Sequence, residues 1–284
     1  MATITNQAAL SYNGITTLSN IAVGELLEVL TATKTAADET YTAGGVKTFA
    51  LSLVNSSTAA LTGLTVTDTL GSYTFGGNTL YPLTYAAGSL LYYVNGVLQA
   101  TPTVAADVPL TITGITVPAG GSAMLIYSAA VNEYAPLGAE DSITNTATIT
   151  GGGLAAPVTA TETINASTAP RLSISKSLCP ATVAENGTLA YTLTLQNQGN
   201  TAADAGDELV ITDTFDPILR DLTVRFNGAV WTEGVHYTYD AATGAFATVV
   251  GALTVPAATF TQDAATGVFT VDPGTSELVI SGAL

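Results

Sequence analysis

The chain has 284 residues, of which 47% are hydrophobic and only 10% are charged. Its net charge is −16, and only six residues are basic, so we expect no nucleic-acid partner, because phosphate contacts need clustered lysine and arginine. No apolar run reaches the length of a membrane span, so we also expect no insertion into a bilayer. The acidity is expected to keep the molecules soluble and apart before any assembly.

Apolar and polar residues alternate along most of the chain, with turn residues after about every ten positions. The pattern predicts an all-β protein made of two tandem immunoglobulin-like β-sandwiches. In chain order, we expect an N-terminal extension at 1–27, a first sandwich at 28–165, a linker at 166–170 and a second sandwich at 171–284. Strands are expected near 2–12, 15–33, 47–54, 61–68, 90–98, 109–117, 122–131, 143–150 and 156–164.

The second half of the chain repeats the first. T-A-T-K-T (31–35) matches S-I-S-K-S (173–177), and G-L-T-V-T-D-T-L (63–70) matches E-L-V-I-T-D-T-F (208–215). The strand I-T-N-T-A-T-I-T (143–150) has no match after the last segment of the second half. A similar segment, I-T-N-Q-A-A-L (4–10), stands at the N-terminus instead. We therefore expect the second sandwich to lack its final strand.

Three repeated polar residues break the inside-outside alternation. Lys34, Asp68 and Asn145 each share a strand face with apolar neighbours, so their side chains are predicted to point into the first sandwich. Lys176 and Asp213 are the equivalent residues of the second half, and Asn6 is the equivalent of Asn145. An inward lysine is costly unless it is paired or neutral, so this arrangement needs a chemical reason.

The three residue types together suggest an intramolecular isopeptide bond. A desolvated lysine loses its proton more readily and becomes a nucleophile. A buried, protonated aspartate can polarise the asparagine amide and carry the proton. The expected crosslinks are Lys34–Asn145 within the first sandwich and Lys176–Asn6 between molecules, with Asp68 and Asp213 as the catalytic acids. The alternative is a buried Lys–Asp ion pair that does not react.

A sandwich without its final strand exposes backbone groups and apolar side chains that a strand from another molecule can cover. The expected donor strand presents Ile4, Asn6, Ala8 and Leu10, with 15–27 as a possible second strand. Donor and acceptor lie at opposite ends of the chain, so the contact would propagate into a filament. The competing geometry has the N-terminal strand folding back onto its own second sandwich.

The order of a lysine strand, Y-T-L-T-L-Q-N-Q-G-N (191–200), V-I-T-D-T-F (210–215) and I-T-N-T-A-T-I-T (143–150) resembles the bacterial surface repeat called domain of unknown function eleven. That resemblance implies an immunoglobulin-like sandwich on the surface of mostly Gram-positive bacteria. The Lys-Asp-Asn order is also similar to isopeptide-bonded pilin and adhesin domains. These imply Lys34 and Lys176 as amine donors, Asp68 and Asp213 as acids, and Asn145 and Asn6 as acceptors. A chain of two such repeats also resembles the subunits of clostridial spore appendages.

The function expected from these observations is a structural subunit of an extracellular fibre on a cell or spore surface, with copies of itself as partners. The alternative is a surface adhesin or stalk that does not polymerise, for which a tyrosine cluster could form a binding face. We expect no enzyme beyond self-crosslinking, no cofactor and no metal, and the N-terminus shows no signal peptide pattern. The tyrosines in question are Tyr81, Tyr85, Tyr92 and Tyr93.

The sequence also supports expectations for three smaller features. Cys179 is the only cysteine, and we expect a buried or half-buried side chain, with an intermolecular disulfide as the alternative. His236 is expected to be a surface or hairpin residue. Two D-A-A-T-G copies, at 240–244 and 263–267, are expected to be hairpin loops, with a calcium site as a weaker alternative.

Overall fold

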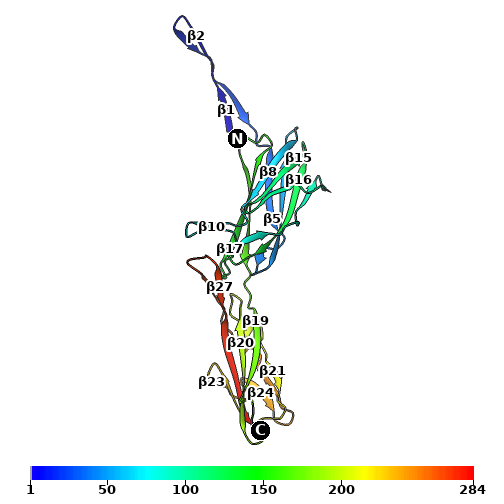
Figure 1. Cartoon of the computed structure of the whole chain (residues 1–284), viewed down its shortest axis with the longest axis vertical. Helices are drawn as coiled ribbons and strands as arrows, with labels where there is room; N and C mark the ends of the chain where they lie inside the picture. Colours follow the sequence, from blue (N-terminus) through cyan, green and yellow to red (C-terminus); the bar gives the residue numbers. More distant parts are fainter. Residues whose placement is uncertain (1) are drawn as a thin grey trace.

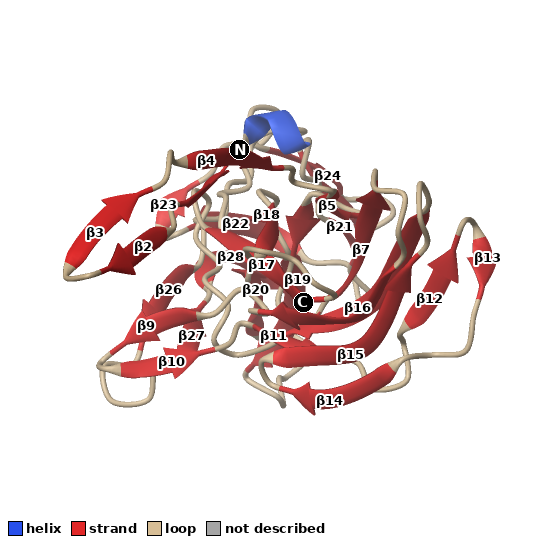
Figure 2. Cartoon of the chain, turned by 90° about the horizontal axis from the view of Figure 1, so that it is seen from above, coloured by secondary structure: helices blue, strands red, loops and turns tan. Residues whose placement is uncertain are grey.

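The computed structural model describes residues 2–284 as an elongated molecule with three parts in a row (Figure 1). A thin N-terminal ribbon leads into a first sandwich, and a second sandwich follows at the opposite end. Strands make up nearly all of the regular structure (Figure 2). In the part of the chain that is described, the one helical element is the 3-10 turn η1 (Ala205–Asp207). The predicted all-β class is therefore confirmed.

The N-terminal ribbon, residues 2–26, consists of two antiparallel pairs in one continuous hairpin. β1 pairs with β4, β2 pairs with β3, and the tip is an Asn13-Gly14 turn in which both residues have positive φ, 45° and 77°. Asn-Gly adopts this conformation readily, which accounts for the hairpin. All side chains from 3 to 25 are exposed. The strands are β1 (Ala2–Asn6), β2 (Ala9–Tyr12), β3 (Ile15–Leu18) and β4 (Ala22–Leu26).

The first sandwich packs two six-stranded sheets around an apolar core. One sheet has the order β13-β12-β16-β7-β5, with β11 also paired to β16, and the other has the order β14-β15-β8-β17-β18-β6. Alternating residues of both sheets point inward, as period-two patterning requires. The strands of the first sheet are β5 (Leu30–Ala36), β7 (Val46–Asn55), β11 (Leu83–Tyr85), β12 (Leu91–Val94), β13 (Val97–Leu98) and β16 (Ser122–Val131). Those of the second are β6 (Thr40–Tyr41), β8 (Leu61–Asp68), β14 (Thr103–Asp107), β15 (Leu110–Val117), β17 (Ser142–Gly151) and β18 (Val158–Ala166), beside a separate hairpin of β9 (Tyr73–Phe75) and β10 (Asn78–Leu80).

The second sandwich has its own core but fewer strands. A five-stranded sheet, in the order β19-β20-β28-β22-β23, faces a three-stranded sheet in the order β21-β25-β24. The five strands are β19 (Leu172–Cys179), β20 (Thr188–Asn197), β22 (Arg220–Phe226), β23 (Ala229–Val230) and β28 (Gly274–Ala283). The three are β21 (Thr212–Thr214), β24 (Tyr237–Asp240) and β25 (Ala245–Thr248), beside a hairpin of β26 (Thr259–Gln262) and β27 (Phe269–Asp272).

The two sandwiches correspond strand by strand until the second one stops. β19, β20, β28 and β22 repeat the order of β5, β7, β16 and β12, while β21 and β25 repeat β8 and β15. Within residues 2–284, however, nothing takes the places of β17 and β18. β8 pairs with strands on both sides, whereas β21 pairs only with β25. The gap in the second sandwich is therefore two strands wide.

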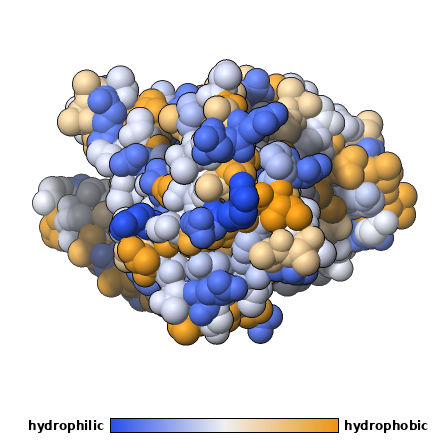
Figure 3. Space-filling view, turned by 90° about the horizontal axis from the view of Figure 1, so that it is seen from below, coloured by the Kyte–Doolittle hydropathy of each residue, from blue (hydrophilic) through white to orange (hydrophobic). Residues whose placement is uncertain are grey.

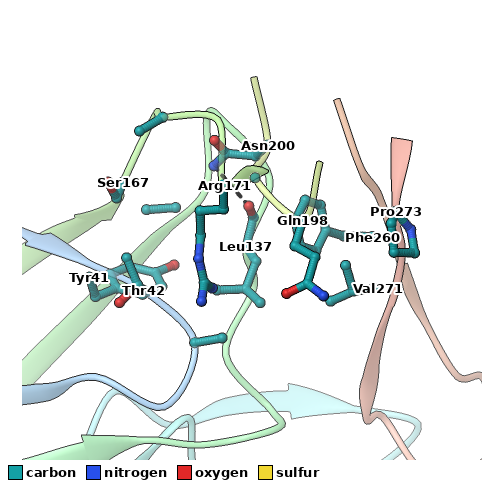
Figure 4. Close-up of a pocket in the computed structure, with 14 residues that line it drawn as sticks. Tyr41, Thr42, Leu137, Ser167, Arg171, Gln198, Asn200, Phe260, Val271 and Pro273 are labelled. Atoms are coloured by element: carbon teal, nitrogen blue, oxygen red, sulfur yellow. Dashed lines mark hydrogen bonds between the residues drawn. The ribbon is translucent and has the colours of Figure 1, made fainter. Parts of the chain in front are cut away.

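The junction between the sandwiches is braced by polar contacts. Gln262 Nε2 of the second sandwich donates to Tyr73 Oη at 2.9 Å, and Asn200 Nδ2 donates to the Leu137 carbonyl at 2.9 Å. A pocket at this junction has Arg171 and Phe260 among its lining residues (Figure 4). It contains none of the predicted site residues. Seen from below, apolar patches interrupt a largely polar surface (Figure 3).

Several smaller expectations can be compared directly with the structure. Asp240 and Asp263 close hairpin loops by accepting hydrogen bonds from their own loop residues, which confirms the loop prediction and lowers the pKa of both carboxyls. Tyr85 and Tyr92 are buried in the core of the first sandwich rather than gathered on a binding face. His236 is half-buried and stacks on Trp231.

The expectation of a buried or half-buried Cys179 was wrong. The side chain is exposed at the end of β19, and its thiol is free. Every residue of β19 is exposed, because the layer that would cover this strand is absent from the second sandwich. Among the described residues, no helix could cross a bilayer and no three His, Cys, Asp or Glu side chains gather as a metal site would require.

Candidate functional site

The structure brings Lys34, Asp68 and Asn145 together in the centre of the first sandwich. β5 lies in one sheet, and β8 and β17 lie in the other. The alternation of side chains along each strand turns all three residues inward. Lys34 is 4% exposed, Asp68 1% and Asn145 0%. Lys34 Nζ lies 2.5 Å from Asp68 Oδ2, and the ammonium sits over the Phe49 ring, 5.1 Å from its centroid.

A fourth side chain, Tyr127 of β16, connects the aspartate to the asparagine. Its hydroxyl donates to Asp68 Oδ2 at 2.5 Å, and it accepts from Asn145 Nδ2 at 3.3 Å. Lys34, Asp68, Tyr127 and Asn145 therefore form one hydrogen-bonded chain. Such a chain can carry a proton from the amine to the amide nitrogen.

The carbonyl oxygen of Asn145 faces two donors. Gly71 N–H donates to Oδ1 at 3.2 Å, and Thr69 Oγ1 donates to it at 3.3 Å. Gly71 has φ of +72°, and a Cβ there would lie 2.3 Å from Ile143 Cγ2, so the turn that aims this N–H requires glycine. Paired donors of this kind stabilise the negative charge that an amide oxygen gains when a nucleophile attacks its carbon.

Burial changes the acid-base properties of this cluster. Burial lowers the pKa of Lys34 from its ordinary value of 10.5, although the Asp68 carboxylate opposes this shift. Burial also raises the pKa of Tyr127 well above 10, and the nearby Asp68 charge adds to that effect. A lysine whose pKa is lowered supplies more of the neutral amine that can attack a carbonyl. The arrangement thus contains an amine, an acid, a proton relay and an amide held by two donors.

The second sandwich contains the same lysine and aspartate in the same register. Lys34 lies opposite Leu51 on the neighbouring strand, and Lys176 lies opposite Leu193 in the same way. Lys176 Nζ donates to Asp213 Oδ2, and the ammonium lies 4.4 Å from the centroid of the Tyr191 ring. The Lys176 side chain is 39% exposed, so this pair is open to water, unlike the first.

Two parts of the first cluster have no equivalent in the second. Tyr127 lies opposite Phe49, and the matching pair in the second sandwich is Ile280 opposite Tyr191, so an isoleucine replaces the tyrosine. The asparagine has no equivalent either, because no strand of residues 2–284 takes the place of β17 in the second sandwich. Asn6, its predicted substitute, lies on β1 in the ribbon, at the far end of the molecule from β19 (Figure 1). A single chain does not bring Asn6 to Lys176.

The sequence analysis missed Tyr127, Thr69 and Gly71. Tyr127 looks like one more large residue in an alternating strand, and a backbone donor such as Gly71 N–H has no sequence signature of its own. The T-D-T repeat points to its aspartate, and the threonine that follows the aspartate in both copies is the sequence feature that could have indicated Thr69.

No protein-family model matches the chain, and no curated protein matches it. Structural similarity is found to the major pilin subunit of Bacillus cereus, at 13% identity and a TM-score of 0.36, covering 96% of this chain and 73% of that one. The pilus backbone of Streptococcus pneumoniae is similar at 9% identity and a TM-score of 0.34, covering 86% of this chain. This chain spans 55% of that structure's length. A collagen-binding domain of a Staphylococcus aureus adhesin is similar at 14% identity and a TM-score of 0.30, covering 50% of this chain and 99% of that domain.

Proposed function

We propose that this chain is a structural subunit that assembles head to tail into an extracellular fibre by donor-strand complementation. The observation that carries the proposal is the open side of the second sandwich, which we define as the side between β19 and β21. It presents Lys176 and Asp213 at the positions that Lys34 and Asp68 hold in the first sandwich. There, the strand that contains Asn145 pairs alongside Asp68. The exposed ribbon carries a segment similar to that strand, with Asn6 in the place of Asn145.

The geometry of the molecule favours a contact between molecules over one within a chain. The ribbon projects from the end of the first sandwich that is remote from the second (Figure 1). An exposed apolar edge on one molecule and an open sandwich on the next can satisfy each other, and a contact between two different surfaces repeats indefinitely. The expected product is a filament of identical subunits on a bacterial cell or spore surface. A surface repeat of the domain of unknown function eleven type fits this role.

The proposed chemistry joins Lys to Asn in both places and is balanced without an oxidant. A proton passes from Lys34 Nζ to Asp68, and the neutral amine attacks Asn145 Cγ. A new C–N bond forms, the bond from Cγ to Nδ2 breaks, and ammonia leaves with the proton that Asp68 returns through Tyr127. The attacking nitrogen gives a second proton to the Asp68 carboxylate, so the amide keeps one N–H and Asp68 ends protonated and neutral. The product is a neutral amide, which removes the buried charge. The equivalent joint between molecules is Lys176 to Asn6, with Asp213 as its acid, so the protein acts as an enzyme only on itself.

Deletion of residues 1–12 tests the assembly. The full chain is expected to form filaments in negative-stain images, and the deletion variant is expected to stay monomeric by sedimentation. Filaments from the deletion variant would rule out donor-strand assembly, and monomers from the full chain would favour the adhesin alternative. Intact mass tests the chemistry separately: each chain should lack one ammonia from the first sandwich, and Lys34→Ala should restore it.

A further inference from the structure

The open side of the second sandwich has room for more than one strand. In the first sandwich, β17 covers the edge of β8, and β18 lies beyond β17 and also packs against β5. Glu162 of β18 reaches back to accept a hydrogen bond from the Ala36 amide of β5 at 3.2 Å. The cover of β5 therefore comes from β18, and the described part of the second sandwich has no equivalent of either strand.

The residues of β19 that such strands would cover are correspondingly exposed. Leu30 of β5 is 3% exposed, whereas Leu172, its equivalent on β19, is 41% exposed. Ile174 on the same face of β19 is 56% exposed. A single added strand beside β21 would occupy the place of β17 and leave β19 uncovered. Apolar side chains in such a row indicate that a second strand covers them as well.

The ribbon resembles the β17–β18 pair in construction, although its register shifts by one residue between the β1–β4 and β2–β3 pairs. In β17–β18, Ile143 lies opposite Ile164 and Asn145 opposite Glu162. In the ribbon, Ile4 lies opposite Gly24 and Asn6 opposite Ala22. Both are antiparallel pairs in which the asparagine strand comes first.

On the outward face, both pairs have contacts between hydroxyl groups of the two strands. Thr146 contacts Thr161 through their hydroxyls at 3.0 Å, and Ser11 contacts Thr16 in the same way at 2.9 Å. On the opposite, inward face, the ribbon presents exposed apolar residues, among them Ile4 at 54%, Leu10 at 65% and Tyr12 at 53% exposure. The ribbon is therefore a folded, two-stranded unit with one polar and one apolar face along its first strand.

We propose that the occupant of the open side is the whole ribbon, residues 2–26, of a second copy, inserted as a preformed pair. Residues 2–12 lie beside β21 with Ala8 opposite Asp213, as Ala147 lies opposite Asp68. Residues 15–26 then cover β19 as β18 covers β5. The inference rests on the proposed head-to-tail assembly and adds which edge of the ribbon pairs, in what register, and that both strands are needed.

A pair of cysteines tests the edge and the register in the full chain. In a Cys179→Ser background, Ala9→Cys with Thr212→Cys copies the pair Thr148 and Thr67, and it should give disulfide-linked ladders under mild oxidation. The control is Leu18→Cys with Thr212→Cys, because Leu18 is the partner of Ala9 on the other strand of the ribbon. Ladders from the control alone would show that the opposite edge inserts and would overturn the inference. Absence of filaments from the unsubstituted chain would instead overturn the assembly itself.

A third variant tests whether the second strand covers β19. Leu172→Cys, again with Cys179→Ser, should react with a maleimide in the monomer and lose at least about tenfold in rate in filaments, because residues 15–26 bury it. Val97→Cys on β13, an exposed site of the first sandwich, should react equally in both forms. Filaments in which Leu172→Cys stays fully reactive would show that only one strand is donated.

Discussion

The two sandwiches hold the same Lys–Asp pair in opposite states of enclosure. Lys34 and Asp68 are sealed between two sheets, and the side chain of Lys176 is 39% exposed. The residues, the strands and the register are the same, so the difference does not come from the pair itself. It comes from β17 and β18, which have no counterpart in the second sandwich within residues 2–284.

In this comparison, the covering strands β17 and β18 supply the enclosure of the Lys–Asp pair. Burial is the largest cause of the lowered Lys34 pKa, and β17 brings both the cover and the Asn145 amide. Within residues 2–284, the exposed Lys176–Asp213 pair has neither the cover nor the amide. A joint of this type would be inert on the free subunit and become reactive only when the ribbon has docked, so that the crosslink follows correct assembly.

The largest expected effect separates docking from crosslinking. Asn6→Ala removes the acceptor amide and keeps the apolar residues of the ribbon, so filaments should still form but should dissociate completely in hot detergent. Unsubstituted filaments should give a ladder on the same gel. Gln7→Ala is the control, because this neighbouring amide points to the Ser19 carbonyl, and its ladder should persist. A ladder from Asn6→Ala would place the acceptor elsewhere.

The next effect concerns the crosslink inside the first sandwich. Asn145→Ala has no side-chain amide to lose, so its intact mass should equal the mass of its sequence. It should also lose about 4 kcal/mol of unfolding free energy, by analogy with a disulfide that closes a loop of roughly 100 residues. Denaturant unfolding of the first sandwich measures this loss. Asn165→Ala, on the exposed face of β18, should change stability by less than about 0.5 kcal/mol. An Asn145→Ala protein as stable as the parent would argue that Lys34 and Asp68 form an unreacted pair.

A smaller effect tests the proton relay by changing the residue at the Tyr127 position, which is an isoleucine in the second sandwich. Tyr127→Phe should slow bond formation in the first sandwich by about 100-fold, the usual contribution of a positioned acid or base. Ile280→Tyr should speed ladder formation between subunits, because it provides the relay that the second sandwich lacks. Both are followed by mass or gel against time. Equal rates for Tyr127→Phe and the parent would remove Tyr127 from the mechanism.

The inward placement of Lys34, Asp68 and Asn145 could be predicted from the sequence. Each has apolar neighbours two positions away, and two-residue alternation is a strong constraint in a half-buried strand. The repeat then located Lys176 and Asp213 without further information. What these predictions used was local spacing, which a single chain determines by itself.

Other features depended on contacts that local spacing does not encode. Cys179 is exposed because no strand of residues 2–284 covers β19, so the usual preference of cysteine for the interior was misleading. The Tyr127 hydroxyl and the Gly71 amide acquire their roles from residues far along the chain. The width of the gap depends on the packing of β18 against β5, two strands that are far apart in the sequence.

The smallest expected effect is a pH dependence of the uncrosslinked first sandwich, best measured on Asn145→Ala. The pKa of Lys34 is lowered in the folded state, so below 10.5 the unfolded chain binds more protons, and stability should rise with pH as that value is approached. The pKa of Tyr127 is raised, so above 10 the unfolded chain releases a proton that the folded chain keeps, and stability should fall. Unfolding free energy against pH should therefore pass through a maximum near these values. Adding Lys34→Met should flatten the rising side alone and adding Tyr127→Phe should weaken the falling side, whereas an unchanged profile in both would mean that neither group is perturbed by its burial.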